Sequence, residues 1–370
     1  MSNKIVFFKD IVKEEWDHYV DQIDETSFAH SWSVLNYFSK FSNIAEHNSF
    51  VYLENNNTPL AICPLAITFN ATDNISEVSF NGTPVSVPAL RSARPSARRK
   101  LLNAIFDVIQ GIVKKHNVKM VKMVRHAINK ECCLNNYITS HNLFELHRYH
   151  MLYYVQNTLI IDLSLANDKL NDNVSKYLRR YIKRSEKRGV KINIFNSNNN
   201  ADKLKELFYK FQSAHATATG GITRPQLTWD CQYKRMLNEE ATLFVAFVDE
   251  TPVSYLYCAE FYYFAIGGSQ VNIKEFEKFY TPRSLLEWSA LLYYKSKGFK
   301  YYEVGERFYG PQLFYIPTEK EISISDFKER FGGMELPKVY WIGYCDDFYM
   351  EKDIGYRLDN YFKSKNIMFH

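Results

Sequence analysis

Alternation of hydrophobic and polar residues in the first third of the chain predicts a mixture of helices and strands. Two short segments near the N-terminus have helical spacing, and apolar runs after them have the length of strands. Asn81-Gly82 is a turn signal between strands, and Pro95 opens a long amphipathic helix before another strand. The expected helices are 16–23, 33–41 and the one from 95, and the expected strands are 50–54, 60–69, 77–80 and 118–124.

The remainder of the chain repeats this kind of pattern. Asp172 or Asn173 is expected to cap a helix that ends at Gly189, a residue type that favours helix C-termini. Thr281 and Pro282 predict the cap and the first residue of a later helix. The other expected elements are helices at 201–215, after 225 and at 349–365, and strands at 157–163, 190–195, 242–248, 253–261, 263–268 and 301–304.

The order of these elements indicates a degenerate tandem repeat. A meander, a helix and a strand occur in sequence on both sides of residues 150–157, and no strict sequence repeat accompanies them. A length of 370 residues suits two domains. We therefore expect two α/β domains joined near 150–157, with the helix at 349–365 packing back against one of them.

Composition and charge narrow the class of protein. Hydrophobic residues make up 46% and charged residues 24%, which excludes disorder over most of the chain, and a net charge of +5 is too small for a dedicated nucleic-acid coat. The six cysteines form no C-x-x-C pair, and the longest apolar stretch, 60–69, is too short to span a bilayer. With no signal peptide recognisable, we expect a reduced, cytoplasmic chain without a metal site.

The densest charge feature is the expected helix within 176–191. Eight basic residues stand against one acid, Glu186, and the apolar positions 174, 178, 181, 182 and 185 define the opposite, inward face. This pattern suits either a solvated helix face or a platform for phosphates or an RNA backbone. The basic residues are Lys176, Arg179, Arg180, Lys183, Arg184, Lys187, Arg188 and Lys191.

Two further segments could carry chemistry. Phe327 and Phe331 are spaced to anchor a short helix that presents Lys328, either as part of a glycine-capped helix or as a lysine aimed at a phosphate. Gly267-Gly268 inside a strand indicates a bulge or a close backbone approach. No dinucleotide, P-loop, zincin or hydrolase motif is present, and histidines such as His30 and His215 are interpreted as structural.

Several of these motifs together resemble the FemABX-like family of tandem GNAT-fold transferases. The resemblance covers about 14–341 and implies an α/β (α+β) fold, with two tandem GNAT-like domains of mixed, mostly antiparallel sheets flanked by helices. It implies a first domain at 1–152, with 338–370 returning to it, and a second at 153–337, with a groove between them. The motifs are His30-Ser31-Trp32-Ser33, the runs 159–163, 177–189 and 326–333, the 280–298 helix and Tyr302-Glu303-Val304-Gly305.

The resemblance also implies a function and a substrate site. Members transfer an aminoacyl or acyl group onto an amine of a cell-envelope precursor, and Lys328 inherits the contact with the phosphates of the acceptor. In members of the family an arginine of the basic helix also contacts the acceptor, and Arg179 or Arg180 is the matching residue here. Asn36 replaces a lysine found four residues after the tryptophan in peptidoglycan-type members, which argues against a muropeptide acceptor. The remaining residues expected to bind substrate are Lys183, Trp32, Gly268, Gln270 and Arg283.

The reaction needs a proton acceptor, because a free alkyl amine is mostly protonated at neutral pH. Glu303 and Tyr280 are the candidates, and a purely structural Glu303 is the alternative. No cofactor is expected to bind tightly. The expected partner is a phosphate-bearing sugar precursor, nucleotide- or lipid-linked, with charged tRNA as the donor, no DNA, and a peripheral contact with the inner membrane face as an option.

Three readings of the function stay open at this point. Neither 279–284 nor 91–96 contains the glycines with which acetyl-CoA-dependent GNAT enzymes cradle a pyrophosphate, which favours aminoacyl-tRNA as the donor. The first alternative is an acyl-CoA-dependent N-acyltransferase acting on an amino sugar. The second is a non-catalytic protein that binds the glycan precursor and has lost turnover.

Overall fold

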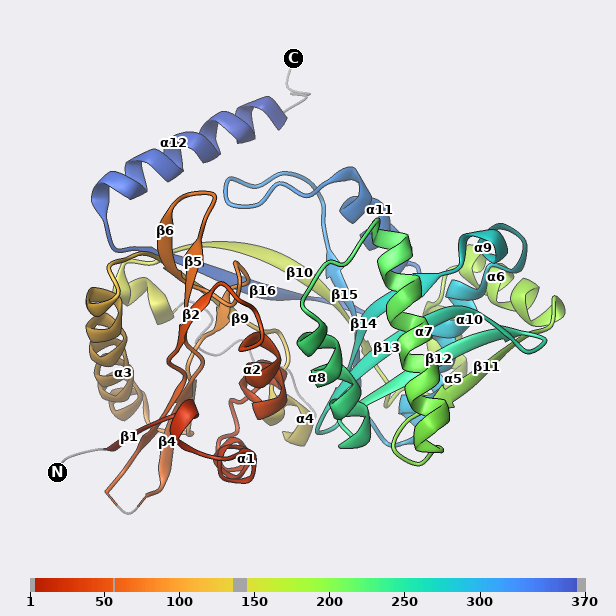
Figure 1. Ribbon diagram of the computed structural model, residues 1–370, viewed down its shortest axis with the longest axis horizontal. Helices are drawn as coiled ribbons and strands as arrows, with labels where there is room; N and C mark the ends of the chain where they lie inside the picture. The colour runs from red at the N-terminus through yellow and green to blue at the C-terminus, as the bar shows by residue number, and fades with distance from the viewer. Residues whose placement is uncertain (1–3, 56, 136–144, 365–370) are drawn as a thin grey trace. The chain divides into compact units, whose positions relative to one another are not determined.

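The computed structural model describes residues 4–55, 57–135 and 145–364. It divides into two compact units (Figure 1). Unit 1 comprises Met1–Gln156, Phe308–Ile322 and Pro337–His370, and unit 2 comprises Asn157–Arg307 and Ser323–Leu336. The sequence-based bounds place 308–322 in the second domain, whereas the structure packs this segment with unit 1.

Unit 2 is built on a sheet in the order β11-β12-β13-β14-β15-β10. Neighbouring strands are antiparallel except β14 and β15, which run parallel because helix α10 crosses between them. The strands are β10 (Leu152–Asp162), β11 (Val190–Phe195), β12 (Ala241–Val248), β13 (Thr251–Phe261), β14 (Phe264–Asn272) and β15 (Tyr301–Arg307).

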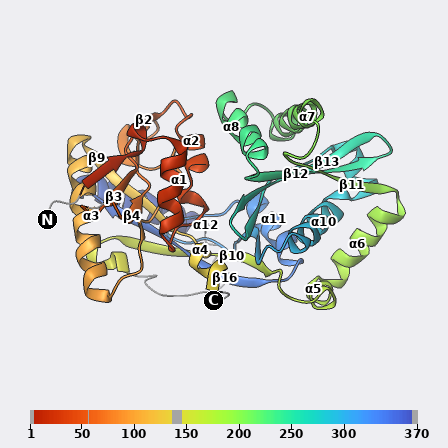
Figure 2. The same ribbon diagram turned by 90° about the horizontal axis from the view of Figure 1, so that it is seen from below.

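Helices cover both faces of this sheet (Figure 2). Alternate residues of β12 point to opposite sides, so Phe244 joins a core with α5, α6 and α10, and Leu243 joins a core with α7 and α8. The helices are α5 (Asn167–Asn173), α6 (Lys176–Lys187), α7 (Ala201–Thr219), α8 (Gln226–Leu237), α9 (Lys274–Tyr280) and α10 (Pro282–Ser296), and α11 (Glu319–Glu329) ends in this unit.

Unit 1 repeats the central arrangement, with β6 parallel to β9 and helix α3 between them in sequence. The strands of the larger sheet are β2 (Ile44–His47), β5 (Ala66–Asn70), β6 (Ile75–Val78), β7 (Val85–Ser86), β9 (Val118–Arg125) and β16 (Met334–Tyr344). A smaller sheet contains β1 (Lys4–Phe7), β3 (Phe50–Leu53), β4 (Pro59–Cys63) and β8 (Ala89–Leu90). The helices are α1 (Lys13–Gln22), α2 (Trp32–Phe38), α3 (Pro95–Lys115), α4 (Lys130–Asn135) and α12 (Asp347–Ser364), with short 3₁₀ turns at Phe8–Asp10, Phe28–His30 and Glu145–Tyr149.

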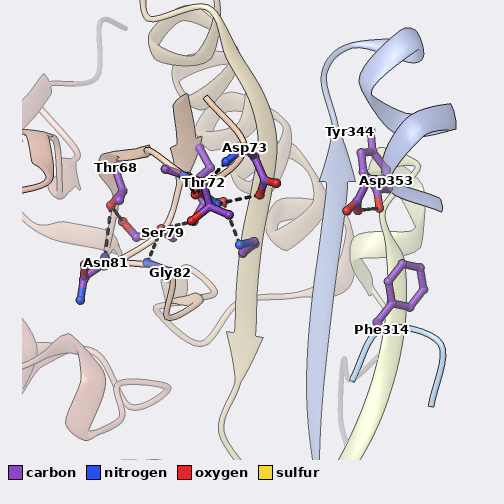
Figure 3. A network of polar contacts seen from close by, with 12 residues as sticks. Thr68, Thr72, Asp73, Ser79, Asn81, Gly82, Phe314, Tyr344 and Asp353 are labelled. Atoms are coloured by element: carbon purple, nitrogen blue, oxygen red, sulfur yellow. Dashed lines mark hydrogen bonds and ion pairs between the residues drawn. The ribbon is translucent and has the colours of Figure 1, made fainter. Parts of the chain in front are cut away.

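The turn predicted at Asn81-Gly82 is confirmed and shapes unit 1 (Figure 3). Both residues have positive φ, and the Ser79 hydroxyl accepts a hydrogen bond from the Gly82 amide at 2.9 Å while donating to Glu77 at 2.7 Å. Thr68 donates to the Ser79 carbonyl at 2.7 Å. The turn lets β7 continue the parallel ladder along β9 beyond β6.

Three sequence-based predictions of element boundaries are wrong. The strand expected at 60–69 is two strands, β4 and β5, which lie in different sheets. The strand expected at 157–163 begins five residues earlier, as β10 at Leu152, and its pairing with β15 starts only at Asn157. The helix expected after an Asp172 or Asn173 cap is α6, which begins at Lys176. Asp172 and Asn173 instead end a separate helix, α5, and Ser175 caps α6 by accepting a hydrogen bond from the Leu178 amide at 3.2 Å.

His30 is a structural residue of unit 1, as expected from the sequence. Its Nδ1 accepts a hydrogen bond from the Ser27 amide at 3.0 Å, so its Nε2 carries the proton and donates to the Val87 carbonyl at 2.9 Å. This arrangement needs the neutral ring. Burial lowers the pKa of His30 to about 4.

Acid is therefore expected to destabilise the protein through His30. Between about pH 6.5 and pH 4 the unfolded chain binds a proton at this ring that the folded chain does not, so stability falls as the pH falls, by about 3 kcal/mol. Urea unfolding at pH 7 and pH 4.5 measures the loss. A His30→Gln variant should lose less between the two pH values, and an equal loss would contradict the prediction.

No helix among the described residues is both long and apolar enough to cross a membrane. All six cysteines are free.

Candidate functional site

The candidate site of unit 2 begins where the β14–β15 ladder ends. Pairing runs from Phe264–Tyr301 to Ile266–Glu303, and within the described residues the two strands continue without pairing to each other. In unit 1 the corresponding ladder is prolonged by β7. Because the ladder stops at Glu303 in unit 2, the backbone of β15 beyond Glu303 does not pair with β14, and side chains or a ligand can approach it from that side.

Gly267 and Gly268 form the bulge predicted for this strand. The register between β13 and β14 shifts here, and a Cβ atom on Gly267 would lie 2.8 Å from the Tyr302 hydroxyl. A Cβ atom on Gly268 would lie 2.7 Å from the Tyr257 carbonyl oxygen. Both separations are too short for any side chain, so the close approach requires glycine at both positions.

Lys328 lies against Gly305 on β15. A Cβ atom on Gly305 would be 2.0 Å from the Lys328 Nζ, so only glycine leaves room for the ammonium. Among the residues described, Lys328 has neither a hydrogen bond nor an ion pair within 4 Å. Burial lowers the pKa of the Lys328 ammonium below its ordinary value, and three carboxylates act in the opposite direction: Glu287, Glu303 and Glu306. The N–H groups of the Lys328 ammonium therefore have no acceptor among the described residues and are available to a ligand.

Glu287 of α10 forms a buried polar cluster with β15. The Tyr302 hydroxyl donates to Glu287 Oε1 at 2.7 Å, and the Cys258 sulfur lies 3.5 Å from the same hydroxyl. Burial raises the pKa of Glu287, against the hydrogen bond from Tyr302 and the charge of Lys328. The charge of the Glu287 carboxylate favours the protonated form of Lys328 and so opposes the effect of burial on the pKa of the lysine.

Three other expected residues are held by contacts near the same strands. Glu303 is half-buried and accepts a hydrogen bond from the Thr158 hydroxyl at 2.6 Å. Gln270 Oε1 accepts a hydrogen bond from Arg283 Nε at 3.0 Å, and the Arg283 guanidinium lies 3.9 Å from the centre of the Phe327 ring. Arg283 and Phe327 therefore join α10 to the helix that carries Lys328.

The expected residues of the basic helix α6 differ in their surroundings: Arg179 is held by contacts within the protein, whereas Arg180 and Lys183 point to solvent. Arg179 donates to the Asn171 carbonyl at 2.8 Å and lies 3.7 Å from Asp172, which commits it to the end of α5. Arg180 and Lys183 are exposed. Of the two arginines matched to an acceptor contact, Arg180 is thus the one with an uncommitted guanidinium.

The remaining expected residues lie apart from this cluster or in the other unit. Tyr280 ends α9, its ring 4.8 Å from that of Phe279, and among the described residues it has no hydrogen bond or ring contact with Lys328 or Glu303. Trp32 and Asn36 lie on α2 of unit 1, and the Trp32 ring stacks on Phe8 at 4.1 Å. Roles for these three residues stay predictions.

The sequence analysis did not identify Glu287 as a site residue. It named Gly305 only as the last residue of the motif Tyr302-Glu303-Val304-Gly305 and gave it no role in the site. The available signal for Glu287 was one acid within the apolar run of α10, between Leu286 and Trp288. A carboxylate in such a run is buried at a cost unless it has a partner. No comparable local signal connects Gly305 with Lys328.

Comparisons with known proteins identify the fold. No protein-family model matches the chain, and no curated protein matches it significantly. The solved structure of FemX is 12% identical and superposes with a TM-score of 0.66 over 95% of this chain and 100% of its own. L-PGS from Bacillus licheniformis is 12% identical, with a TM-score of 0.55 over 95% of this chain and 97% of its own.

A third similar structure is a tandem GNAT protein from the clavulanic acid biosynthesis pathway, solved without acetyl-CoA. It is 10% identical, with a TM-score of 0.52 over 93% of this chain and 99% of its own. Identities this low show the fold alone. The chain has the tandem GNAT fold of FemX, so the resemblance to the FemABX-like family that its motifs indicate is confirmed at the level of the fold.

Proposed function

We propose that this protein is a transferase that moves an aminoacyl or acyl group onto an amine of a phosphate-bearing cell-envelope glycan precursor, nucleotide- or lipid-linked, in the cytoplasm. The observation that carries the proposal is Lys328, whose half-buried side chain places its ammonium against Gly305 with no hydrogen bond or ion pair from the described residues. A partly desolvated cation of this kind is suited to a phosphate or a developing oxyanion. The tandem GNAT fold supports the reaction class.

In the proposed reaction, the acceptor amine attacks the carbonyl carbon of an ester. The new C–N bond forms, the bond between the carbonyl carbon and the ribose oxygen of a charged tRNA breaks, and that oxygen leaves as a hydroxyl with the second proton released by the attacking nitrogen. Positioning supplies much of the rate, because the ester is already activated. Glu303 is proposed to take the proton that the acceptor ammonium must lose before its free amine can attack, since Glu303 lies at the end of the ladder and is one of the carboxylates whose charge acts on Lys328.

We favour aminoacyl-tRNA over acyl-CoA as the donor. Helix α10 begins with Pro282, which lacks an amide hydrogen, and Thr281 before it has φ of 50°. Pro282 and Ser284 are buried, and the Arg283 side chain is held by Gln270. These contacts leave little free backbone for a pyrophosphate cradle at this helix.

Lys328→Ala is the variant that tests the proposal. We expect it to raise the KM for the acceptor roughly tenfold or more, because a charge-assisted contact with phosphate contributes about 1.5 to 3 kcal/mol. The assay offers charged tRNA and a panel of acyl-CoAs in parallel to amino-sugar nucleotides and follows the product by mass. Lys205→Ala, on the exposed side of α7, is the matched control and should leave the KM unchanged.

Three outcomes would change the proposal. An unaltered acceptor KM in the Lys328→Ala variant would remove this residue from the acceptor site. Transfer from acetyl-CoA with none from charged tRNA would establish the acyl-CoA-dependent alternative. Calorimetric binding of a nucleotide sugar with no product from any donor would favour a non-catalytic binding protein.

A further inference from the structure

Helix α6 presents a row of uncommitted cations. Leu178 and Ile182 bury one side of the helix in the core of unit 2, so residues on the other side point to solvent. Four exposed basic residues recur there at intervals of three or four, and none has a hydrogen bond or an ion pair with any residue that the structure describes. These crest residues are Lys176, Arg180, Lys183 and Lys187.

A second row, along the flank of the helix, combines aromatic rings with arginines. The Tyr177 and Tyr181 rings lie 4.5 Å apart, and their hydroxyls are 2.7 Å apart. Tyr177 is 49% and Phe279 56% exposed. The guanidinium–ring pairs are Arg184 on Tyr181 at 4.9 Å, Arg330 on Tyr177 at 4.6 Å and Arg188 on Phe279 at 4.1 Å. We call the crest and the flank together the α6 surface.

The α6 surface is connected to the candidate site through the end of α11. The Ser175 amide, at the cap of α6, donates to the Arg330 carbonyl at 2.8 Å. Arg330 lies on Tyr177 and follows Lys328 by two positions. A ligand that lies along the flank therefore reaches the segment that carries Lys328, the residue proposed to contact the acceptor.

We propose that the α6 surface binds RNA, with the crest cations on the phosphates and the unpaired bases of a 3′ end stacked on the guanidinium–ring pairs. Single-stranded RNA is recognised by aromatic and arginine planes together with cationic grooves, and the two rows supply both. The inference rests on the proposed function, because an acylated 3′ end must come close to Lys328. It adds the surface that would hold the donor.

The chemistry of the surface favours RNA over an anionic membrane. A helix that binds at a membrane interface exposes an apolar face beside its cations. The apolar side of α6 is buried against the sheet, and only polar and charged residues form the crest. The exposed rings of the flank are covered in part by guanidinium groups rather than free to enter lipid.

The test uses the full chain and uncharged RNA, so it is independent of transfer. Fluorescence anisotropy measures binding of a full tRNA transcript, of a 12-nucleotide single strand ending in CCA, and of a blunt RNA duplex, each at several salt concentrations. Vesicles of 30% phosphatidylglycerol form a parallel arm. The crest variant is Arg180→Ala/Lys183→Ala/Lys187→Ala, and its control removes the same charge from exposed positions on α7 and α8: Lys203→Ala/Lys205→Ala/Lys234→Ala.

We expect the crest variant to lose roughly 50-fold in tRNA affinity near physiological salt and to lower the salt slope by about 2, whereas the control binds as the parent does. Tyr177→Ala should weaken the single strand by roughly fivefold or more and the duplex hardly at all. Equal binding by the crest and control variants would overturn the proposal, as would binding to the vesicles without binding to RNA. RNA binding without transfer would instead contradict the proposed function alone.

Discussion

Gly305→Ala is expected to lower kcat/KM for transfer roughly tenfold or more, as far as Lys328→Ala does. The added Cβ atom would lie 2.0 Å from the Lys328 Nζ, so the ammonium must move by more than an ångström. A displacement of that size takes the ammonium away from the acceptor phosphate, so the variant should lose the charge-assisted contact that Lys328→Ala removes. The φ of Gly305 is 132°, which a non-glycine residue also tolerates poorly. Steady-state kinetics with charged tRNA and an amino-sugar nucleotide measure the effect.

Gly298→Ala is the matched control for this prediction. Gly298 follows α10 with φ of 78°, and a Cβ atom there meets nothing within 4 Å. The control should lose stability like Gly305→Ala but keep its transfer rate. The double variant Gly305→Ala/Lys328→Ala should be no slower than Lys328→Ala alone, because the glycine acts through the lysine. Parental kinetics in a folded Gly305→Ala protein would contradict this account.

Arg98→Ala is expected to destabilise the protein by about 3 to 5 kcal/mol. Arg98, on α3 of unit 1, donates to Glu145 Oε2 and Oε1 at 2.8 Å and also binds Glu25. The side chains of Arg98 and Glu145 are each only 9% exposed. Removing the arginine leaves two buried carboxylates with fewer partners, which is the costly way to break such a pair. The midpoint of urea unfolding measures the loss.

An exposed ion pair provides the control for Arg98. Lys210 and Glu206 are one turn apart on α7 and both are half-exposed or more, so Lys210→Ala should leave the urea midpoint unchanged. Replacing Glu25 and Glu145 by glutamine in the Arg98→Ala background should recover part of the stability. A loss below about 1 kcal/mol for Arg98→Ala would show that this cluster is not coupled to folding.

Local features of the fold followed from the sequence because they depend on neighbouring residues. The spacing of Leu178 and Ile182 predicted both α6 and its buried side. Asn81-Gly82 predicted a turn because these two residue types adopt positive φ readily. Phe327 and Phe331 predicted the helix turn that carries Lys328. The first residues of β10, before Asn157, were not predicted as strand for the opposite reason: β10 lies between strands that are distant in sequence, β15 and β16, and its pairing with β15 begins only at Asn157.

The candidate site was predictable only in part. The motifs drew attention to Lys328, Glu303 and Gly268, and the structure places Lys328 and Glu303 in one electrostatic environment. The choice between Arg179 and Arg180 could not be made from spacing, because the Asn171 carbonyl that holds Arg179 belongs to a helix absent from the expected pattern. Tyr280 keeps its candidate role without a contact that supports it.

By itself, then, the sequence determined the helical and strand periods, the basic face of α6 and the absence of common cofactor motifs, because each is encoded within a few consecutive residues. Tertiary structure alone decided that the β14–β15 ladder stops at Glu303, that Gly305 makes room for Lys328, and that Glu287 meets Tyr302. Such contacts depend on strand register, and a shift of one residue would turn each side chain to the other face of the sheet.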